Sequence, residues 1–212
     1  MPCNHKFQNE LHLELVDYEP ATLIVGSFNP DLDDKNTAEW FYGRTADSCF
    51  WDVLPRLYGS PSLIDATPAE WKQFCRDNRI ALTDIISCID DADLKNKVQA
   101  RALAGFSDKA IEYNFDDFDF INIVKLLQSR PSIKNVYLTR GITEAFWRHL
   151  WNPVVQYCNR NNMHERRLLT PSPDADYHHE AYNHDHPENK IPLLEDYILM
   201  RWKEEWHVAT DL

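Results

Sequence analysis

The sequence predicts an α/β fold of three layers, with helices on both faces of a central, mostly parallel, four-stranded sheet. Two observations predict it. Short apolar runs typical of buried strands alternate with segments in which apolar residues recur at helical spacing. Unusual polar residues follow four of these apolar runs, as expected where parallel strands end at a common edge.

The chain has 212 residues, which is enough for one well-cored domain, and we expect a single domain spanning 1–212. It contains no apolar stretch long enough to span a bilayer. The N-terminus lacks the basic start and apolar core of a signal peptide. We therefore expect a cytoplasmic protein without a membrane partner, and a monomer as its default state.

Charge and cysteine content restrict the function classes. A net charge of −12 counts against a large nonspecific nucleic-acid surface, although it leaves room for a basic rim around one cleft. The cysteines stand singly, without C-x-x-C spacing, which argues against a disulfide framework, a zinc ribbon or an iron–sulfur cluster. Reduced thiols are therefore expected at Cys3, Cys49, Cys75, Cys88 and Cys158.

The first third of the chain predicts one strand and two helices. The strand is expected at 22–26, and residues 29–46 form a long polar loop of a kind that is often functional. Apolar residues at helical spacing predict a helix over about 48–58, with Pro55 inside it. A capping box followed by proline predicts a second helix over about 67–79.

The rest of the chain continues this alternation. Strands are expected at 80–86, at 136–138 and in a run that ends at Leu168-Leu169. Helices are expected within 90–104, over 121–130, and at 142–151, 154–161 and 191–206. Between the last strand and the last helix, a polar, His-rich loop is expected to run to Pro187.

Polar residues gather where four strands are predicted to end. They are Asn29-Pro30, Thr83-Asp84, Thr139-Arg140 and the run Thr170-Pro171-Ser172-Pro173. In a parallel sheet these ends lie at one edge, where ligands bind, and a functional site is predicted there. The alternative is structural, because Asn-Pro is common in turns and Thr-Asp can cap a strand end.

With these residues in this order, the chain resembles the uracil-DNA glycosylase superfamily, most closely its mismatch-specific and hypoxanthine-directed branches. The resemblance covers about residues 20–175. It is carried by GSFNP at 26–30, FYG at 41–43, FW at 50–51, LTDIISC at 82–88 and PSP at 171–173.

The resemblance implies hydrolysis of the N-glycosidic bond of a deaminated base, uracil or hypoxanthine, that is flipped out of DNA into a pocket. Such a reaction needs a water positioned at the sugar carbon, donors directed at the base and a flat ring on which the base stacks. DNA is then the partner, base-excision repair the process, and neither a metal nor an organic cofactor is needed.

The resemblance also implies residue roles. Asn29 would position the catalytic water, and Ser172 would support the sugar or phosphate. Tyr42 would stack on the base, with Phe41 as the alternative, although Phe41 could equally be a core aromatic. The other residues of the pocket would be Gly26, Ser27, Phe28, Ser48, Thr83, Asp84 and Thr170.

Asp84, with Thr83 beside it, would read the edge of the base. A carboxylate accepts hydrogen bonds but cannot donate them, so it favours a base edge that presents N–H groups. This chemistry favours a purine such as hypoxanthine, or an amine-bearing base.

Three positions depart from the family pattern. Thr170 stands where the best-known members carry His, Ser48 where relatives often carry Asn, and Asp31 where relatives usually carry Gly. The change at Thr170 removes a strong donor to the leaving group. It favours an alternative class, a non-catalytic relative that binds a nucleobase, a nucleotide or a protein in the same cleft.

Several residues outside the pocket are candidates for DNA contacts. Arg44, Arg140 and Arg166-Arg167 would reach phosphates, unless they pair with the many acidic side chains, and Tyr177 or His178 would probe a groove. Four histidines within 178–186 suggest a metal-dependent hydrolase as a third alternative. Their spacing matches no known helical metal motif, and we expect no metal.

Overall fold

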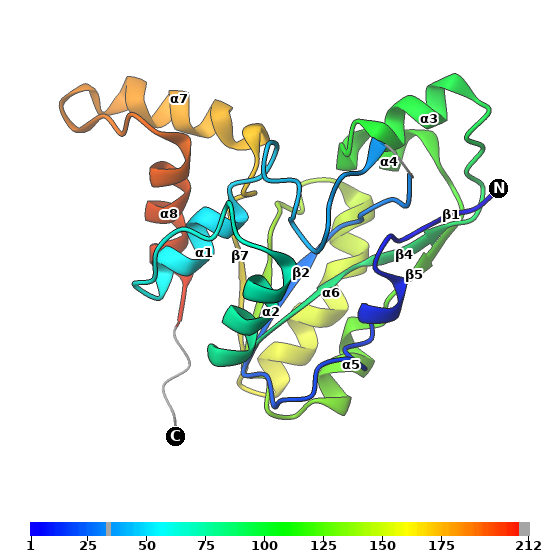
Figure 1. Cartoon of the computed structure of the whole chain (residues 1–212), viewed down its shortest axis with the longest axis horizontal. Coiled ribbons are helices and arrows are strands. Elements are labelled where there is room, and N and C mark those ends of the chain that lie inside the picture. The colour runs from blue at the N-terminus through cyan, green and yellow to red at the C-terminus, as the bar shows by residue number, and fades with distance from the viewer. Residues whose placement is uncertain (33–34, 208–212) are drawn as a thin grey trace.

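The computed structural model describes residues 1–32 and 35–207, and its centre is a four-stranded parallel sheet (Figure 1). The sheet order is β3-β2-β6-β7, with β2 at Thr22–Gly26, β3 at Ile80–Asp84, β6 at Asn135–Leu138 and β7 at His164–Arg167. Helices flank this sheet. The predicted α/β class with a parallel four-stranded sheet is confirmed.

The single strand predicted at 80–86 is wrong, because the chain leaves the parallel sheet after Asp84. The Ile85 N–H donates to the Gly26 carbonyl at 3.1 Å, and the following residues form β4 at Ile86–Ile89. β4 pairs antiparallel with β1 at Cys3–Asn4 and β5 at Phe118–Phe120, which makes a second sheet that the sequence did not predict. The polar pair Thr83-Asp84 interrupts the apolar run at this bend, but it does not show that the residues after it join a different sheet.

The strand predicted to end at Leu168-Leu169 ends at Arg167 instead. β7 has the sequence HERR and lies at the edge of the sheet, where its residues are half-buried or exposed. The apolar pair just after it therefore marks the point where the chain re-enters the core. Leu168 still donates its N–H to the Leu138 carbonyl at 2.8 Å.

The helices keep the predicted order and differ in detail. The capping box is present, because Thr67 Oγ1 accepts from the Glu70 N–H and the Glu70 carboxylate accepts from the Thr67 N–H. The observed helices are α1 Phe50–Leu57, α2 Pro68–Asp77, α3 Lys97–Ala104, α4 Asp108–Asn114, α5 Ile123–Ser129, α6 Ala145–Arg160, α7 Asp176–Asp185 and α8 Leu194–Glu205.

The division of one helix into two is wrong, and two helices were not predicted. The helices expected at 142–151 and 154–161 are one helix, α6, which contains Pro153. The His-rich loop expected up to Pro187 is largely the helix α7. Of its residues only His179 is buried, so α7 has no apolar stripe that could predict it. The second unpredicted helix is the short α4.

A cluster of stacked tryptophans packs the loop after β2 against two helices. Trp51 of α1 is fully buried and stacks on Trp71 of α2, with ring centroids 5.1 Å apart. Trp40, in the loop between β2 and α1, stacks on Trp51 as well, with ring centroids 5.7 Å apart. The loop that carries Phe41 and Tyr42 is therefore anchored to these two helices.

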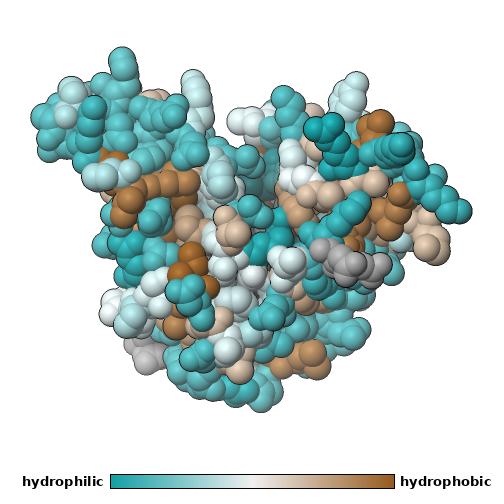
Figure 2. Space-filling view, turned by 45° about the horizontal axis from the view of Figure 1, so that its top comes forward, coloured by the Kyte–Doolittle hydropathy of each residue, from teal (hydrophilic) through white to brown (hydrophobic). Residues whose placement is uncertain are grey.

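Two groups of helices stand on either side of the edge where the parallel strands end. α7 and α8 form one group, and α3 and α4 form the other (Figure 1). The surface is notched between them, and mostly hydrophilic residues border the notch (Figure 2). Within residues 1–32 and 35–207, no helix combines the length and apolar character needed to cross a membrane.

Candidate active site

A pocket lies at the carboxyl edge of the parallel sheet, below the notch. Its volume is about 130 Å³, roughly ten times the space that one buried water needs, so a ligand of several heavy atoms fits. Twelve of the predicted site residues line it: Gly26, Ser27, Phe28, Asn29, Phe41, Tyr42, Arg44, Ser48, Asp84, Arg140, Thr170 and Ser172.

Gly26 ends β2 at the floor of this pocket. Its strand partner is Asp84, the last residue of β3. A Cβ atom on Gly26 would lie 2.3 Å from Asp84 Oδ1 and 2.9 Å from the Tyr42 hydroxyl. Glycine is therefore required here, because the side chains of Asp84 and Tyr42 lie directly over the end of the strand.

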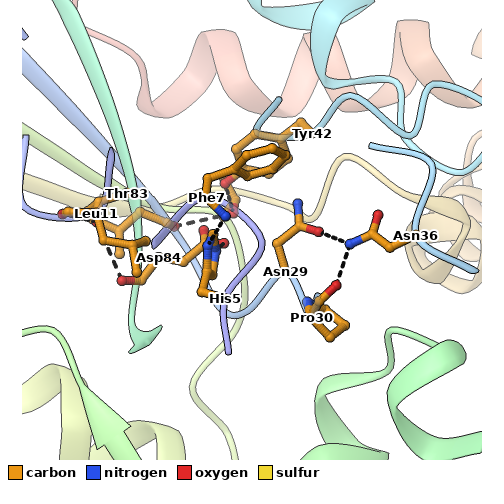
Figure 3. Close-up of polar contacts among 11 residues, drawn as sticks. His5, Phe7, Leu11, Asn29, Pro30, Asn36, Tyr42, Thr83 and Asp84 are labelled. Carbon is orange, nitrogen blue, oxygen red and sulfur yellow. Dashed lines mark hydrogen bonds and ion pairs between the residues drawn. The ribbon is translucent and has the colours of Figure 1, made fainter. Parts of the chain in front are cut away.

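Asp84 is held by His5, a residue that no sequence motif marks. His5 Nε2 lies 2.7 Å from Asp84 Oδ2, and both side chains are almost completely buried (Figure 3). The Phe7 N–H donates to His5 Nδ1 at 2.9 Å, so Nδ1 carries no proton. His5 is therefore the neutral Nε2–H tautomer, and it donates to Asp84.

Asn29 lies at the mouth of the loop that follows β2, and it is 9% exposed. Its Oδ1 accepts a hydrogen bond from Asn36 Nδ2, and the same nitrogen donates to the Pro30 carbonyl at 2.6 Å (Figure 3). The backbone is held as well, because the Lys6 N–H donates to the Asn29 carbonyl at 2.8 Å. The N-terminal segment thus supports both Asn29 and Asp84.

Tyr42 has one ring face covered and its hydroxyl fixed. Phe50 stacks on the ring, with centroids 3.8 Å apart and planes 5° apart, so only the opposite face can receive a flat ligand. Thr139 Oγ1 donates to the Val25 carbonyl at 3.3 Å, and the Tyr42 hydroxyl therefore donates to Thr139, at 2.8 Å. Burial, followed by the charge of Asp84, raises the pKa of Tyr42 well above its usual value.

The backbone of Tyr42 is also unusual. Its φ angle is 56°, in the left-handed region that a bulky residue rarely adopts. The stacking on Phe50 and the hydroxyl bond to Thr139 hold the side chain in this position. Strain that is maintained by surrounding contacts is typical of functional positions.

The second wall of the pocket comes from the chain after β7 and from the start of α1. Thr170 Oγ1 and Ser172 Oγ lie 3.0 Å apart, and the Cys49 N–H donates to the Pro171 carbonyl at 2.9 Å. Ser48 Oγ accepts from the Phe50 N–H at 3.3 Å. The hydroxyls of this wall can both donate and accept, and the carboxylate of Asp174 lines the pocket beside them.

Two of the predicted residues point to structural roles. Phe41 is 1% exposed and packs against His5, Phe7 and Trp40, in agreement with a core aromatic. Thr83 is fully buried, and its hydroxyl donates to the Leu11 carbonyl at 2.7 Å (Figure 3). Thr83 does not line the pocket with Asp84.

Arg140 lines the pocket and is paired with acidic side chains. Its guanidinium pairs with Asp108 of α4, lies 3.4 Å from Glu144 and stacks over the Trp147 ring at 3.8 Å. Burial lowers the pKa of Arg140 and raises that of Asp108, in the second case against the opposing charge of Arg140. This ion pair closes one side of the pocket.

The other residues predicted to contact DNA lie at three separate places in the structure. Arg44 stacks over the ring of Phe106, 3.3 Å from its centroid, and lines the pocket beside it. Tyr177 and His178 are exposed on α7, away from the pocket, and Tyr177 is 76% exposed. Arg166 and Arg167 lie in β7 itself, and Arg166 pairs with Glu205 at 3.1 Å.

The His-rich segment shows structural contacts. His179 Nε2 lies 2.6 Å from the Ile191 carbonyl, and its ring stacks on Tyr197. In the described part of the chain, no group of three or more His, Cys, Asp or Glu side chains is arranged to hold a metal ion.

Comparisons with known proteins address the fold. No protein-family model matches the sequence, and no curated protein is detectably similar to it. Among solved structures, the chain is similar to the solution NMR structure of a putative uracil DNA glycosylase from Methanosarcina acetivorans. The identity is 14%, the TM-score is 0.50, and the match covers 90% of this chain and 94% of the other. The fold is therefore uracil-DNA-glycosylase-like.

Within this uracil-DNA-glycosylase-like fold, sequence reasoning missed several residues in or beside the pocket, among them His5, Asn36, Phe106 and Asp108. Each lies in a segment without a strand-end or motif signal. His5 and Asn36 are recognisable only from their hydrogen bonds to Asp84 and Asn29. Phe106 and Asp108 reach the pocket through the unpredicted start of α4.

Proposed function

We propose that this protein is a DNA glycosylase that removes a deaminated base, uracil or hypoxanthine, during base-excision repair. One observation carries the proposal. Asn29 and Tyr42 of the loop after β2, Asp84 at the end of β3 and Ser172 after β7 come from three separate parts of the chain and line one pocket at the edge of the parallel sheet. The uracil-DNA-glycosylase-like fold supports the same function.

In the proposed reaction, the base leaves the DNA stack and lies against the open face of Tyr42. Asp84 accepts a hydrogen bond from an N–H group at the edge of the base. Asn29 binds the water that attacks the sugar. The bond between the sugar carbon and the base nitrogen breaks, and its electron pair stays with the base. The water oxygen bonds to the sugar carbon, its proton passes to solvent, and the anionic base takes up a proton from solvent. Ser172 supports the sugar or the adjoining phosphate.

A second function is favoured by the acidic lining of the pocket. Asp47, Asp84, Asp108 and Asp174 all line it, and the chain carries a net charge of −12. Negative charge opposes both phosphate binding and the release of an anionic base. A protein that binds a free nucleobase or nucleotide through its N–H groups, without cleavage, is therefore the alternative.

The test is a single-turnover assay with excess protein. Single- and double-stranded oligonucleotides carry deoxyuridine, deoxyinosine, deoxyxanthosine or a mismatched thymine, and alkali then cleaves any abasic site. We expect cleavage of the deoxyuridine or deoxyinosine strands. Failure with every base in both strand contexts contradicts the glycosylase, and binding of the free base by calorimetry then supports the alternative.

Asn29→Ala separates the enzyme class from the assigned role. We expect a reaction roughly 100- to 1000-fold slower, since loss of one preorganised hydrogen-bonding group in an active site has this effect. Asn189→Ala, at an exposed asparagine, is the matched control. Cleavage by Asn29→Ala at the control rate would retain the glycosylase and reject the role of Asn29.

A further inference from the structure

The orientation of the Asn29 amide is determined by Asn36. Asn36 is 1% exposed, and its side-chain hydrogen bonds are internal. Its Oδ1 accepts from the Ala38 N–H at 3.1 Å. Its Nδ2 donates to the Pro30 carbonyl at 2.6 Å and to Asn29 Oδ1.

Two of these partners are backbone groups with a fixed polarity. The Ala38 N–H can only donate, so the Asn36 atom facing it is the oxygen. The Pro30 carbonyl can only accept, so the atom facing it is the nitrogen. An amide that could otherwise be turned by 180° thus has one possible orientation here.

The orientation of Asn36 then decides that of Asn29. Asn36 Nδ2 is a donor, so the Asn29 atom that it contacts is the acceptor, Oδ1. The Asn29 amide nitrogen is turned away from Asn36 (Figure 3). Within the described residues it has no hydrogen-bond partner, and it is not one of the buried unpaired atoms, so it is open to the pocket that Asn29 lines.

We infer that Asn36 is a positioning residue that fixes Asn29 as a hydrogen-bond donor toward the pocket. This inference rests on the proposed function and specifies its chemistry. Asn29 binds an oxygen lone pair and cannot accept a proton from the attacking water. That oxygen belongs either to the water, which keeps a second lone pair for attack, or to a carbonyl of the leaving base.

The first test is Asn36→Asp, which removes the donor and keeps the size of the side chain. The new carboxylate can still accept from the Ala38 N–H, but it offers no hydrogen to Asn29. Asn29 then turns its NH2 toward this carboxylate and presents Oδ1 to the pocket. We expect the single-turnover rate of cleavage of deoxyuridine and deoxyinosine oligonucleotides to fall about 10- to 100-fold. This is the usual effect of losing a hydrogen bond to a charged group or to a group on which charge develops. Asn189→Asp introduces the same charge at an exposed site and should retain the wild-type rate.

Binding distinguishes the two sources of the oxygen. The probe is the same oligonucleotide with 2′-fluoro-2′-deoxyuridine, which resists cleavage. If Asn29 binds the base carbonyl, the Kd of Asn36→Asp rises by the same factor as the rate falls. If Asn29 binds the water, the rate falls while the Kd stays within about twofold of wild type. A folded Asn36→Asp protein that reacts at or above the wild-type rate overturns the inference.

A second variant covers the case in which Asn36→Asp does not fold. Asn29→Asp keeps one oxygen for the Asn36 donor and turns the other, as an acceptor, toward the pocket. We expect a loss of about 10-fold or more, even though a carboxylate is the better base. Equal or faster cleavage would show that the position works as an acceptor, and would overturn the inference.

NMR of the wild-type protein separates this inference from the proposed function. The Asn36 NH2 protons are both hydrogen-bonded and buried, so they should exchange slowly with solvent, and the Asn29 NH2 protons should exchange faster. The reverse order overturns the role of Asn36, whatever the protein cleaves. The expected order in a protein that cleaves no probe leaves the amide orientation correct and contradicts the glycosylase.

Discussion

The two walls of the pocket differ in how firmly their polarity is determined. On the first wall, Asn29 and Asp84 are bound by Asn36 and His5, and each of these is oriented by a backbone group. On the second wall, Thr170 and Ser172 bind each other, and either hydroxyl can be the donor. One wall therefore has a fixed donor and a fixed acceptor, and on the other wall the hydroxyls of Thr170 and Ser172 can exchange donor and acceptor roles by rotation.

This difference suggests a division of labour. A fixed donor and acceptor discriminate between ligands, because a mismatched group leaves a buried polar atom without a partner. Rotatable hydroxyls discriminate little, and in the proposed reaction they would adapt to the sugar or phosphate. We therefore expect changes to the first wall to affect both stability and activity, and changes to the second wall to affect activity alone.

The largest effect is expected for His5→Ala. The variant leaves the buried Asp84 carboxylate without its donor and opens a cavity, so the free energy of unfolding should fall by about 3 kcal/mol. Urea unfolding monitored by tryptophan fluorescence measures this loss. His178→Ala, at an exposed histidine of α7, should change it by less than about 0.5 kcal/mol. An equally small change in the unfolding free energy of His5→Ala would mean that the hydrogen bond between His5 and Asp84 does not stabilise the first wall.

Ser172→Ala tests the second wall. Ser172 is half-buried and its side chain bonds to the hydroxyl of Thr170, which rotation can satisfy elsewhere, so we expect a change in unfolding free energy below about 0.5 kcal/mol. The single-turnover rate should fall about tenfold, the effect of one neutral hydrogen bond of about 1.4 kcal/mol. Ser62→Ala, at an exposed serine, is the control. A rate equal to that of the control would remove Ser172 from the site.

The first wall also shows how far sequence reasoning reaches. The strand ends predicted a site at the sheet edge, and the structure brings Asn29, Tyr42 and Asp84 together there. Their partners His5 and Asn36 were not predictable, because a hydrogen bond such as that between His5 and Asp84, 79 positions apart, leaves no local pattern. The catalytic roles of Asn29, Tyr42 and Asp84 stay predictions.

The fold was predictable where burial produces a clear pattern. Central strands such as β2 are buried throughout, and the capping box of α2 is local in sequence. The edge strand β7 and the helix α7 are largely exposed, so neither has the periodicity that a core imposes. The break between β3 and β4 depends on which strands pair with each of them, and that pairing is determined only in the assembled fold.

Tyr42→Phe compares the two components that hold Tyr42. The variant keeps the stacking on Phe50 and loses the hydroxyl bond to Thr139, so we expect a loss of about 1 kcal/mol in unfolding free energy. Tyr113→Phe, at a residue 88% exposed, should have no effect in the same urea titration. If Tyr42→Phe loses no more unfolding free energy than Tyr113→Phe, the stacking on Phe50 alone keeps the left-handed backbone of Tyr42 in place.

The smallest effect is expected for Asp108→Asn, which tests the ion pair that closes the pocket. Burial raises the pKa of Asp108 in the folded protein, so its contribution to stability is fully present below its unfolded pKa, near 3.8. That contribution is lost as the pH rises through the higher folded pKa, and Arg140 offsets only part of the loss. The variant does not titrate at this position. Its unfolding free energy relative to wild type should therefore rise between about pH 3 and pH 7, by less than about 1 kcal/mol.

Urea titrations at about pH 3, 5 and 7 measure this difference, with Asp116→Asn, at an exposed aspartate, as the control. A difference that falls with pH would mean that the charge of Arg140 outweighs burial. Asp108 would then belong, with Asp84, to the carboxylates that are firmly held by a partner. The pocket would be closed by a strong ion pair, and its acidic lining would include one carboxylate fewer that is free to bind a base.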